Sequence, residues 1–232
     1  MKKMITVLAL LISANIIAQT ESELKKHFEA YYKQMQIQGD VQGVINALTH
    51  LVIIEPSQAR KDTLAYIYAS EGRYLEALNV IGIDKNPNAS NMNIEIKAVS
   101  LKTLGEAERS LELYELLFQK EPNPYIAYEI ADLKLQLQDL SGAEASIEYG
   151  LKNVKDDMNR TYYETQQPYQ VSLKAAFTYL KAILTFNKDQ NNNIDAAISL
   201  LNEALTMDEN FNLAKISKDA LTNRKKEMNK KN

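Results

Sequence analysis

The chain of 232 residues contains no cysteine and no tryptophan, and it has only 7 glycines and 5 prolines. The lack of cysteine excludes disulfide bonds, thiolate metal sites and a lipid-modified N-terminal cysteine. The few glycines and prolines are spread singly, which argues against a β architecture with frequent turns. Hydrophobic residues make up 45% of the chain and charged residues 25%, a balance typical of a folded protein. Long helices are therefore the expected structure.

The first eighteen residues differ in character from the rest. Lys2 and Lys3 precede an apolar run that begins at Met4, and Ala18 supplies a small residue before a cleavage point. This layout predicts a secretory signal peptide over residues 1–18. The alternative is an uncleaved membrane anchor, but the run is shorter than the roughly 20 residues that span a bilayer. We therefore expect an exported protein, located in the periplasm if the host has two membranes and secreted otherwise.

Acidic and basic residues nearly balance. The net charge is −3, and it becomes −5 when Lys2 and Lys3 are removed with the signal peptide. This balance argues against nucleic acid as a partner, because a nucleic-acid surface needs clustered positive charge. No second apolar run is long enough to cross a membrane, so no membrane span is expected after cleavage. The expected partner is a protein or peptide, and the oligomeric state is left open.

The glycines reveal an internal repeat. Gly39, Gly72 and Gly105 lie 33 residues apart, and one more step of 33 reaches Gln138. Five residues after each of these four positions stands a small residue, and nine residues after stands a large one. The small residues are Val44, Ala77, Ser110 and Ala143, and the large ones are Leu48, Ile81, Tyr114 and Ile147. Each unit is thus predicted to be a helix, a tight turn and a second helix that approaches the first closely.

Two stretches carry a family resemblance. One begins at Gly39 and ends at Pro56, and the other begins at Gly105 and ends at Pro122; in both, the proline falls 17 residues after the glycine. This pattern resembles the tetratricopeptide repeat family. Pro87 follows Gly72 by only 15 residues, which predicts a shortened second helix in the middle unit. Ankyrin repeats share the period, but their Thr-Pro-Leu-His signature is missing.

The resemblance implies an all-α, right-handed superhelical solenoid of about five helix hairpins with a C-terminal capping helix, because neither helix of a hairpin can bury its apolar stripe alone. The predicted segments after the signal peptide are repeats at 19–56, 57–89, 90–122, 123–155 and 168–209, an insertion at 156–167, and a capping helix with a basic tail at 210–232.

No motif for catalysis or cofactor binding is present. His27 and His50 lie in different predicted helices without metal-ligand spacing, and the glycine-rich phosphate loops and the nucleophile elbow are missing. We therefore expect no enzyme activity, no metal site and no cofactor. An enzyme with a site assembled across repeats is the alternative hypothesis.

In the family, first-helix residues line the inner surface of the superhelix. Three successive acids, Glu29, Asp62 and Glu95, stand ten residues before their turn residues and would share one face. This predicts an acidic groove, with aromatic and apolar patches, that binds a neutral or basic peptide or partner protein. The alternatives are a solvated helix face for the acids and core packing for the tyrosines. The candidate groove residues are Glu29, Lys33, Asp62, Tyr66, Glu95, Val99, Tyr125, Tyr128, Asp132 and Leu135.

The predicted insertion offers a second surface. Tyr162, Tyr163 and Tyr169 lie in or beside a polar segment that would form an adhesive surface, since long loops often carry function. The alternative is that these rings fold back on the neighbouring helices. An exposed surface here would suit a structural subunit of an envelope or secretion assembly, which is the second function hypothesis.

Overall fold

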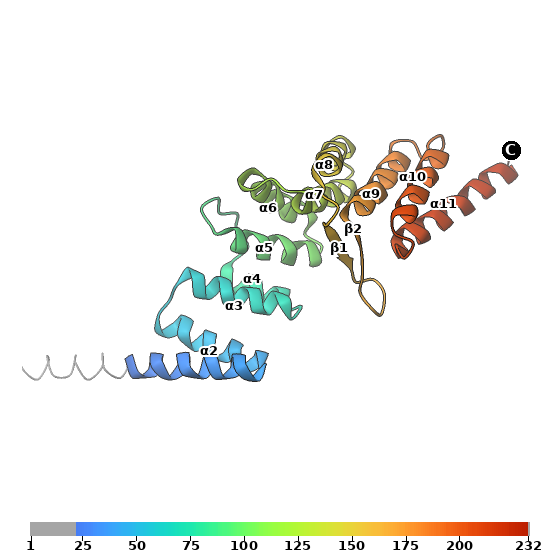
Figure 1. The fold of residues 1–232 in the computed structure, drawn as a ribbon. Coiled ribbons are helices and arrows are strands. Elements are labelled where there is room, and N and C mark those ends of the chain that lie inside the picture. The colour runs from blue at the N-terminus through green and yellow to red at the C-terminus, as the bar shows by residue number, and fades with distance from the viewer. Residues whose placement is uncertain (1–21, 232) are drawn as a thin grey trace, which may run out of the picture. The chain divides into compact units, whose positions relative to one another are not determined.

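The computed structural model describes residues 22–231, so the predicted signal peptide at 1–18 lies outside the described residues. The chain divides into two compact units, one ending at Leu104 and the other beginning at Gly105. We call them the N-terminal and the C-terminal unit and describe each by itself. Both are built mainly of consecutive helices (Figure 1).

Within its described residues, 22–104, the N-terminal unit consists of five helices. A helix over residues 22–38 comes first. It is followed by α2 (Val41–Ile54), α3 (Gln58–Ser70), α4 (Tyr74–Ile81) and α5 (Asn91–Thr103). Side chains cap the N-termini of three of these helices: Asp40, Ser57 and Ser90 accept hydrogen bonds from backbone N–H groups in the first turns of α2, α3 and α5.

The repeated turn has the same geometry in both units. Gly39 and Gly72 have φ values of +69° and +73°, and the residue after each donates its N–H to a carbonyl five residues earlier. This arrangement satisfies helix-end carbonyls and favours glycine. The C-terminal unit forms the same turn at Gln138, at a φ of +60°, although glutamine stands there. The predicted turn positions are thus confirmed.

Small residues mark the places where helices cross. Ala47, Ala65, Ala77 and Ala98 are fully buried in the N-terminal unit, as is Ala131 in the C-terminal unit. Because these side chains are short, helix axes can approach closely, and Ala77 is one of the small residues that the repeat pattern identifies. Around them, Met35, Val44, Ile45, Leu48 and Leu64 form an apolar cluster in the N-terminal unit.

Helix α4 is short, as the position of Pro87 predicts. It has 8 residues, whereas α2 has 14. Residues 82–90 continue the chain as a loop that leads to Ser90, the N-cap of α5. The loop brings Ser90 next to α3, where its hydroxyl donates to the Asp62 carboxylate at 2.8 Å. The loop that follows the short helix α4 thus leads to a residue, Ser90, that contacts α3.

The C-terminal unit adds a β-hairpin to its helices. The helices are α6 (Ala107–Lys120), α7 (Pro124–Gln136), α8 (Leu140–Asn153), α9 (Leu173–Lys188), α10 (Ile194–Met207) and α11 (Asn212–Lys231). The strands β1 (Asn159–Tyr162) and β2 (Tyr169–Ser172) pair antiparallel between α8 and α9. Each helix contacts its neighbour in the chain, and α7 also contacts α9.

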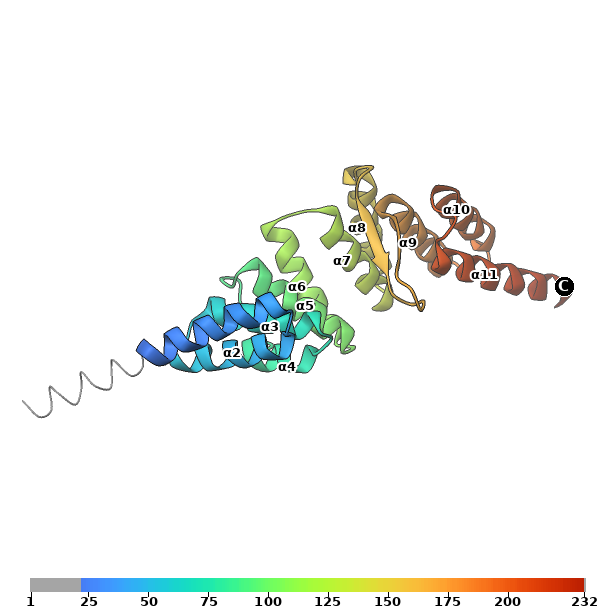
Figure 2. The ribbon, with the colours of Figure 1, turned by 60° about the horizontal axis from the view of Figure 1, so that its bottom comes forward.

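The hairpin departs from the polar insertion expected at 156–167. Arg160 pairs with Val171, and Tyr162 pairs with Tyr169, so these four side chains share one face of the sheet. Tyr162 and Val171 are buried. Because Tyr169 belongs to a strand, the first helix of the repeat predicted at 168–209, which is α9, begins only at Leu173. In Figure 2 the strands run beside α9, in agreement with their contacts.

Candidate binding groove in the N-terminal unit

A groove of about 260 Å³ lies between α3 and α5, with the first residue of α4 at its side. Three residues of the predicted groove meet here: Tyr66 on α3, and Glu95 and Val99 on α5. The other lining residues, which are not among the candidate groove residues, are Ala69, Ser70, Tyr74, Met92 and Ile96. Met92 could have been found, because it stands three residues before Glu95 and therefore on the same helix face.

The groove exposes large apolar side chains. Tyr66 is 57% exposed, Met92 41% and Val99 36%. These residues come from two neighbouring first helices and border one hollow, so they form a continuous apolar patch rather than scattered surface residues. A patch of this kind makes the groove a candidate binding surface.

One carboxylate lies within this apolar patch. Glu95 is exposed and stands between Met92 and Val99 on the same face of α5, at helical spacings of three and four residues. Among residues 22–231, no ion pair is formed by Glu95. The groove therefore offers one negative charge beside apolar surface.

The predicted stripe of three acids is not formed, and that prediction is wrong. The side chain of Asp62 is 3% exposed and accepts hydrogen bonds from Gln58, Ser90 and Asn93 at 2.6 to 2.8 Å. It lines a separate polar hollow beside the 82–90 loop. Glu29 lies next to two cations, 3.6 Å from Arg60 and 4.0 Å from Lys25. Only Glu95 presents its carboxylate to the groove.

The predicted groove residues of the C-terminal unit have other environments. Tyr128 and Leu135 are buried in the core, Asp132 is half-buried and accepts a hydrogen bond from Gln136, and Tyr125 is exposed near the start of α7. Lys33, in the N-terminal unit, is exposed and does not line the groove. The expectation that Tyr128 and Leu135 form a groove floor is therefore wrong.

The β-hairpin explains the burial of Tyr128. The hydroxyl groups of Tyr128 and Tyr162 lie 2.7 Å apart, and the guanidinium of Arg160 sits 4.0 Å from the centre of the Tyr128 ring. Arg160 Nη1 also donates to Glu129 Oε1 at 2.6 Å. Burial raises the pKa of the Tyr128 and Tyr162 hydroxyls above the ordinary tyrosine value. The hairpin thus covers the first-helix face of α7.

The three tyrosines of the predicted insertion surface separate. Tyr162 is buried and packs against Phe211, and Tyr169 is half-buried and stacks on Tyr162. Tyr163 alone is widely exposed, at 75%. The expectation of a three-tyrosine adhesive surface is wrong for Tyr162, because strand alternation turns that ring toward the helices.

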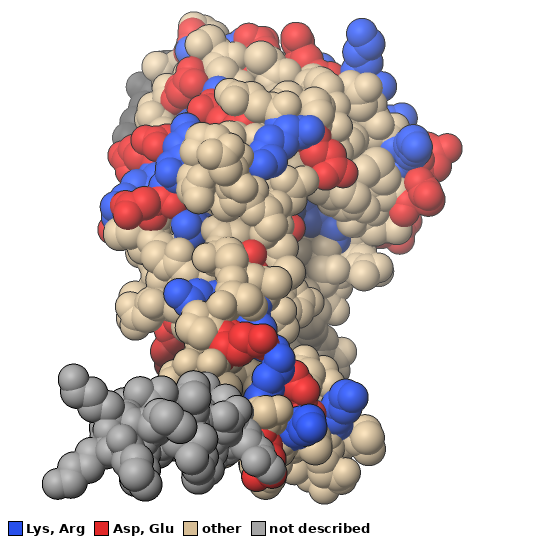
Figure 3. Space-filling model, turned by 90° about the vertical axis from the view of Figure 1, so that its left-hand side faces the viewer, with Lys and Arg blue, Asp and Glu red and all other residues tan. Residues whose placement is uncertain are grey.

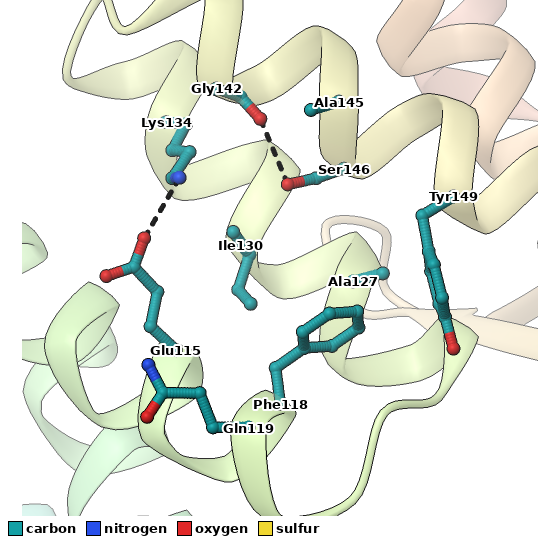
Figure 4. A pocket seen from close by; sticks show the side chains of 10 residues that line it. All are labelled: Glu115, Phe118, Gln119, Ala127, Ile130, Lys134, Gly142, Ala145, Ser146 and Tyr149. Carbon is teal, nitrogen blue, oxygen red and sulfur yellow. Dashed lines mark hydrogen bonds and ion pairs between the residues drawn. The ribbon is translucent and has the colours of Figure 1, made fainter.

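A larger hollow of about 530 Å³ lies in the C-terminal unit, between α6, α7 and α8 (Figure 4). Phe118 and Tyr149 meet edge to face across it, at 4.8 Å between ring centres. At the other side, Lys134 and Glu115 form an ion pair at 2.9 Å. These polar groups therefore satisfy one another, and the hollow presents no unpaired charge comparable to that of Glu95.

The described residues give no sign of a metal site or a membrane span. Within residues 22–231, no group of three potential His, Asp or Glu ligands comes together, and no helix is long and apolar enough to cross a bilayer. On the face shown in Figure 3, acidic and basic side chains are interspersed among the described residues.

Comparisons by sequence find no relative: no family model and no curated protein matches the chain. Comparison with solved structures finds a tetratricopeptide repeat protein from Parabacteroides merdae, with a TM-score of 0.63 and 19% identity, over 86% of this chain and 72% of that one. The protein MamA aligns with a TM-score of 0.59 and 12% identity, over 81% of this chain and 93% of that one.

A putative kinesin light chain from Podosopora anserina, with nearly identical TPR-like repeats, aligns with a TM-score of 0.52 and 16% identity over 81% of this chain and 95% of that one. At such low identities these likenesses concern the fold alone. The expected all-α fold of consecutive helical hairpins is confirmed, and it is the fold of tetratricopeptide repeat proteins.

Proposed function

We propose that the protein is a non-catalytic interaction scaffold, and that the groove between α3 and α5 binds an extended segment of a partner protein. The observation that carries this proposal is the exposed apolar patch of Tyr66, Met92 and Val99 around the unpaired carboxylate of Glu95. A tetratricopeptide fold agrees with a scaffold role, since such folds present first-helix surfaces to extended segments.

The groove lining does not resemble a catalytic site. Its polar side chains are Tyr66, Ser70, Tyr74 and Glu95, and the Ser70 hydroxyl donates to the carbonyl of Ile67 within its own helix. A serine nucleophile needs an adjacent base to accept its proton, and the described contacts of Ser70 include none. His50 stacks on Phe28, outside the groove. Binding rather than catalysis is the function that this lining favours.

We further propose that the protein acts after export, on the basis of the signal-peptide pattern in residues 1–18. The partner would then be met in the periplasm or outside the cell. Fractionation of cells that produce the protein, together with N-terminal sequencing of the product, tests this part. Cytoplasmic protein that retains Met1 would contradict it.

Peptide display tests the groove. A random peptide library would be selected on the purified protein, and the dissociation constants of the selected peptides measured by fluorescence anisotropy. Tyr66→Ala and Met92→Ala should each weaken binding about tenfold, because apolar anchors dominate such interfaces. Tyr125→Ala is the matched control, as it removes an exposed ring from the other unit. Equal affinities for all variants would contradict the proposal.

A structural subunit that makes contacts through its hairpin is a second candidate function. Tyr163 is 75% exposed and follows β1 directly. Under this hypothesis, Tyr163→Ala would abolish partner binding, and Tyr66→Ala would leave it unchanged. The same pair of variants therefore separates the two candidates.

A further inference from the structure

The β-hairpin shows how this chain occupies one of its own first-helix faces. Strand β1 places the Arg160 guanidinium over the Tyr128 ring and against the Glu129 carboxylate. Two residues later, Tyr162 lies on the same face of the strand and packs on the apolar side chains below it. An arginine and an apolar side chain, spaced by two residues along an extended strand, are thus held by a tyrosine, a carboxylate and an apolar floor.

The N-terminal groove presents the same chemical groups without an occupant from the described chain. The hairpin site takes its ring and its carboxylate from adjacent residues of α7, Tyr128 and Glu129. The groove takes its ring from α3, at Tyr66, and its carboxylate from α5, at Glu95. The two faces therefore offer a tyrosine ring and a carboxylate from different helix positions.

The groups of the groove are accessible. Tyr66 is more than half exposed, and its ring makes no aromatic or cation–π contact among residues 22–231. Met92 and Val99 supply the apolar floor on either side of Glu95. By contrast, Tyr128 is buried under the hairpin.

We propose that the groove selects an extended segment in which an arginine precedes an apolar side chain by two residues. The guanidinium stacks on Tyr66 and pairs with Glu95, and the apolar side chain packs on Met92 and Val99. Side chains two residues apart on a strand point the same way, at a spacing of roughly 6.6 Å, which suits two adjoining subsites. Arginine is preferred to lysine because its planar group stacks on a ring while it pairs with a carboxylate. This inference rests on the proposed function of the groove.

The test uses a synthetic peptide with the sequence of residues 158–164, which contains this arginine and tyrosine pair. Three variant peptides are compared with it. In the first, citrulline replaces the arginine, and in the second, lysine replaces it. In the third, serine replaces the tyrosine two positions later. Citrulline keeps the shape of arginine and removes its charge. Binding to the full protein is measured by fluorescence anisotropy at low salt, where exposed charges are least screened.

We expect the citrulline peptide to bind at least tenfold more weakly than the arginine peptide, and the lysine peptide to lie between them. Glu95→Gln in the protein should abolish the preference for arginine over citrulline. Glu108→Gln, which changes an exposed acid on α6, is the matched control and should preserve it.

Two results would overturn the inference. The first is equal binding of the arginine and citrulline peptides that is nevertheless lost with Tyr66→Ala, which would leave the groove as a binding site without arginine selectivity. The second is no binding of the arginine peptide at millimolar concentration. If, in addition, Tyr66→Ala and Met92→Ala leave the affinities of the display-selected peptides unchanged, the proposed function of the groove fails together with this inference.

Discussion

The hydroxyl groups of Tyr128 and Tyr162 lie 2.7 Å apart in the buried interior of the C-terminal unit. The contact joins a first helix to a strand inserted 34 residues later in the chain. It makes the hairpin part of the core of that unit, and it removes Tyr128 from any binding surface. The groove between α3 and α5, by contrast, is open.

Tyr162→Ala should strongly destabilise the C-terminal unit. The substitution removes a buried ring that contacts Tyr128, Tyr169 and Phe211, and it leaves a cavity. We expect a loss of about 3 kcal/mol in the free energy of unfolding, measured by urea denaturation. Tyr163→Ala, next in the chain but exposed, should change this free energy by less than about 0.5 kcal/mol. Similar losses in both variants would show that the hairpin does not pack as described.

Alkaline pH should weaken the C-terminal unit through its buried tyrosines. Burial raises the pKa of Tyr128 and Tyr162, so the folded protein keeps both hydroxyls protonated above pH 10, whereas the unfolded chain releases both protons near that pH. The stabilisation is thus complete below pH 10 and is lost as the pH rises beyond it. Unfolding midpoints measured between pH 8 and 11 test this.

Tyr162→Phe should reduce the alkaline loss of stability, because one of the titrating hydroxyls is gone. Tyr163→Phe is the control and should leave the pH dependence unchanged, since its hydroxyl is exposed. Identical pH profiles for the wild type and Tyr162→Phe would contradict the buried position of the Tyr162 hydroxyl.

Gly150→Ala should destabilise the protein, although alanine usually favours a helix. A methyl group at Gly150, on α8, would overlap the ring of Phe177, which is fully buried on α9. We expect a cost of about 1–3 kcal/mol in thermal or urea unfolding. The double variant Gly150→Ala/Phe177→Leu should lose less free energy of unfolding than the sum of the two single losses, because the smaller leucine leaves room for the added methyl group. Additive losses would count against this contact.

The turn at Gln138 should be improved by glycine. Gln138 has a φ of +60°, a conformation that costs a non-glycine residue about 1 kcal/mol or more. Gln138→Gly should therefore stabilise the C-terminal unit by about 0.5 kcal/mol, once the loss of the side-chain hydrogen bond to Leu135 is included. Gly105→Ala should destabilise the protein, because Gly105 has a φ of +85°, which strains any residue with a side chain. Thermal unfolding of both variants checks the pair, and shifts of the same sign would be contrary to expectation.

Much of the fold follows from the sequence because the repeat encodes it locally. The glycine spacing locates the turns, the small residues locate the helix crossings, and Pro87 predicts the short α4. The hairpin carried a local signal as well, since Tyr169 and Val171 alternate with the polar residues Gln170 and Ser172. A helical repeat pattern nevertheless gave no reason to look for strands.

The site was harder to predict because it depends on contacts between distant residues. Asp62 and Tyr66 lie one helical turn apart on α3, yet Asp62 turns toward Ser90 and Asn93, some thirty residues later in the chain. Likewise, Tyr128 has the position of a groove residue, and only the hairpin buries it. Periodicity assigns residues to a helix face but does not show what covers that face.

The most direct test of the groove follows the methionine methyl groups by NMR, with and without a display-selected peptide. Met92 lines the groove in the N-terminal unit, whereas Met158 lies beside the hairpin and Met207 ends α10 in the other unit. Loss of one signal in Met92→Leu assigns the Met92 resonance. We expect the peptide to shift the Met92 signal and to leave the signals of Met158 and Met207 in place. A shift at Met158 or Met207 with an unchanged Met92 would contradict it.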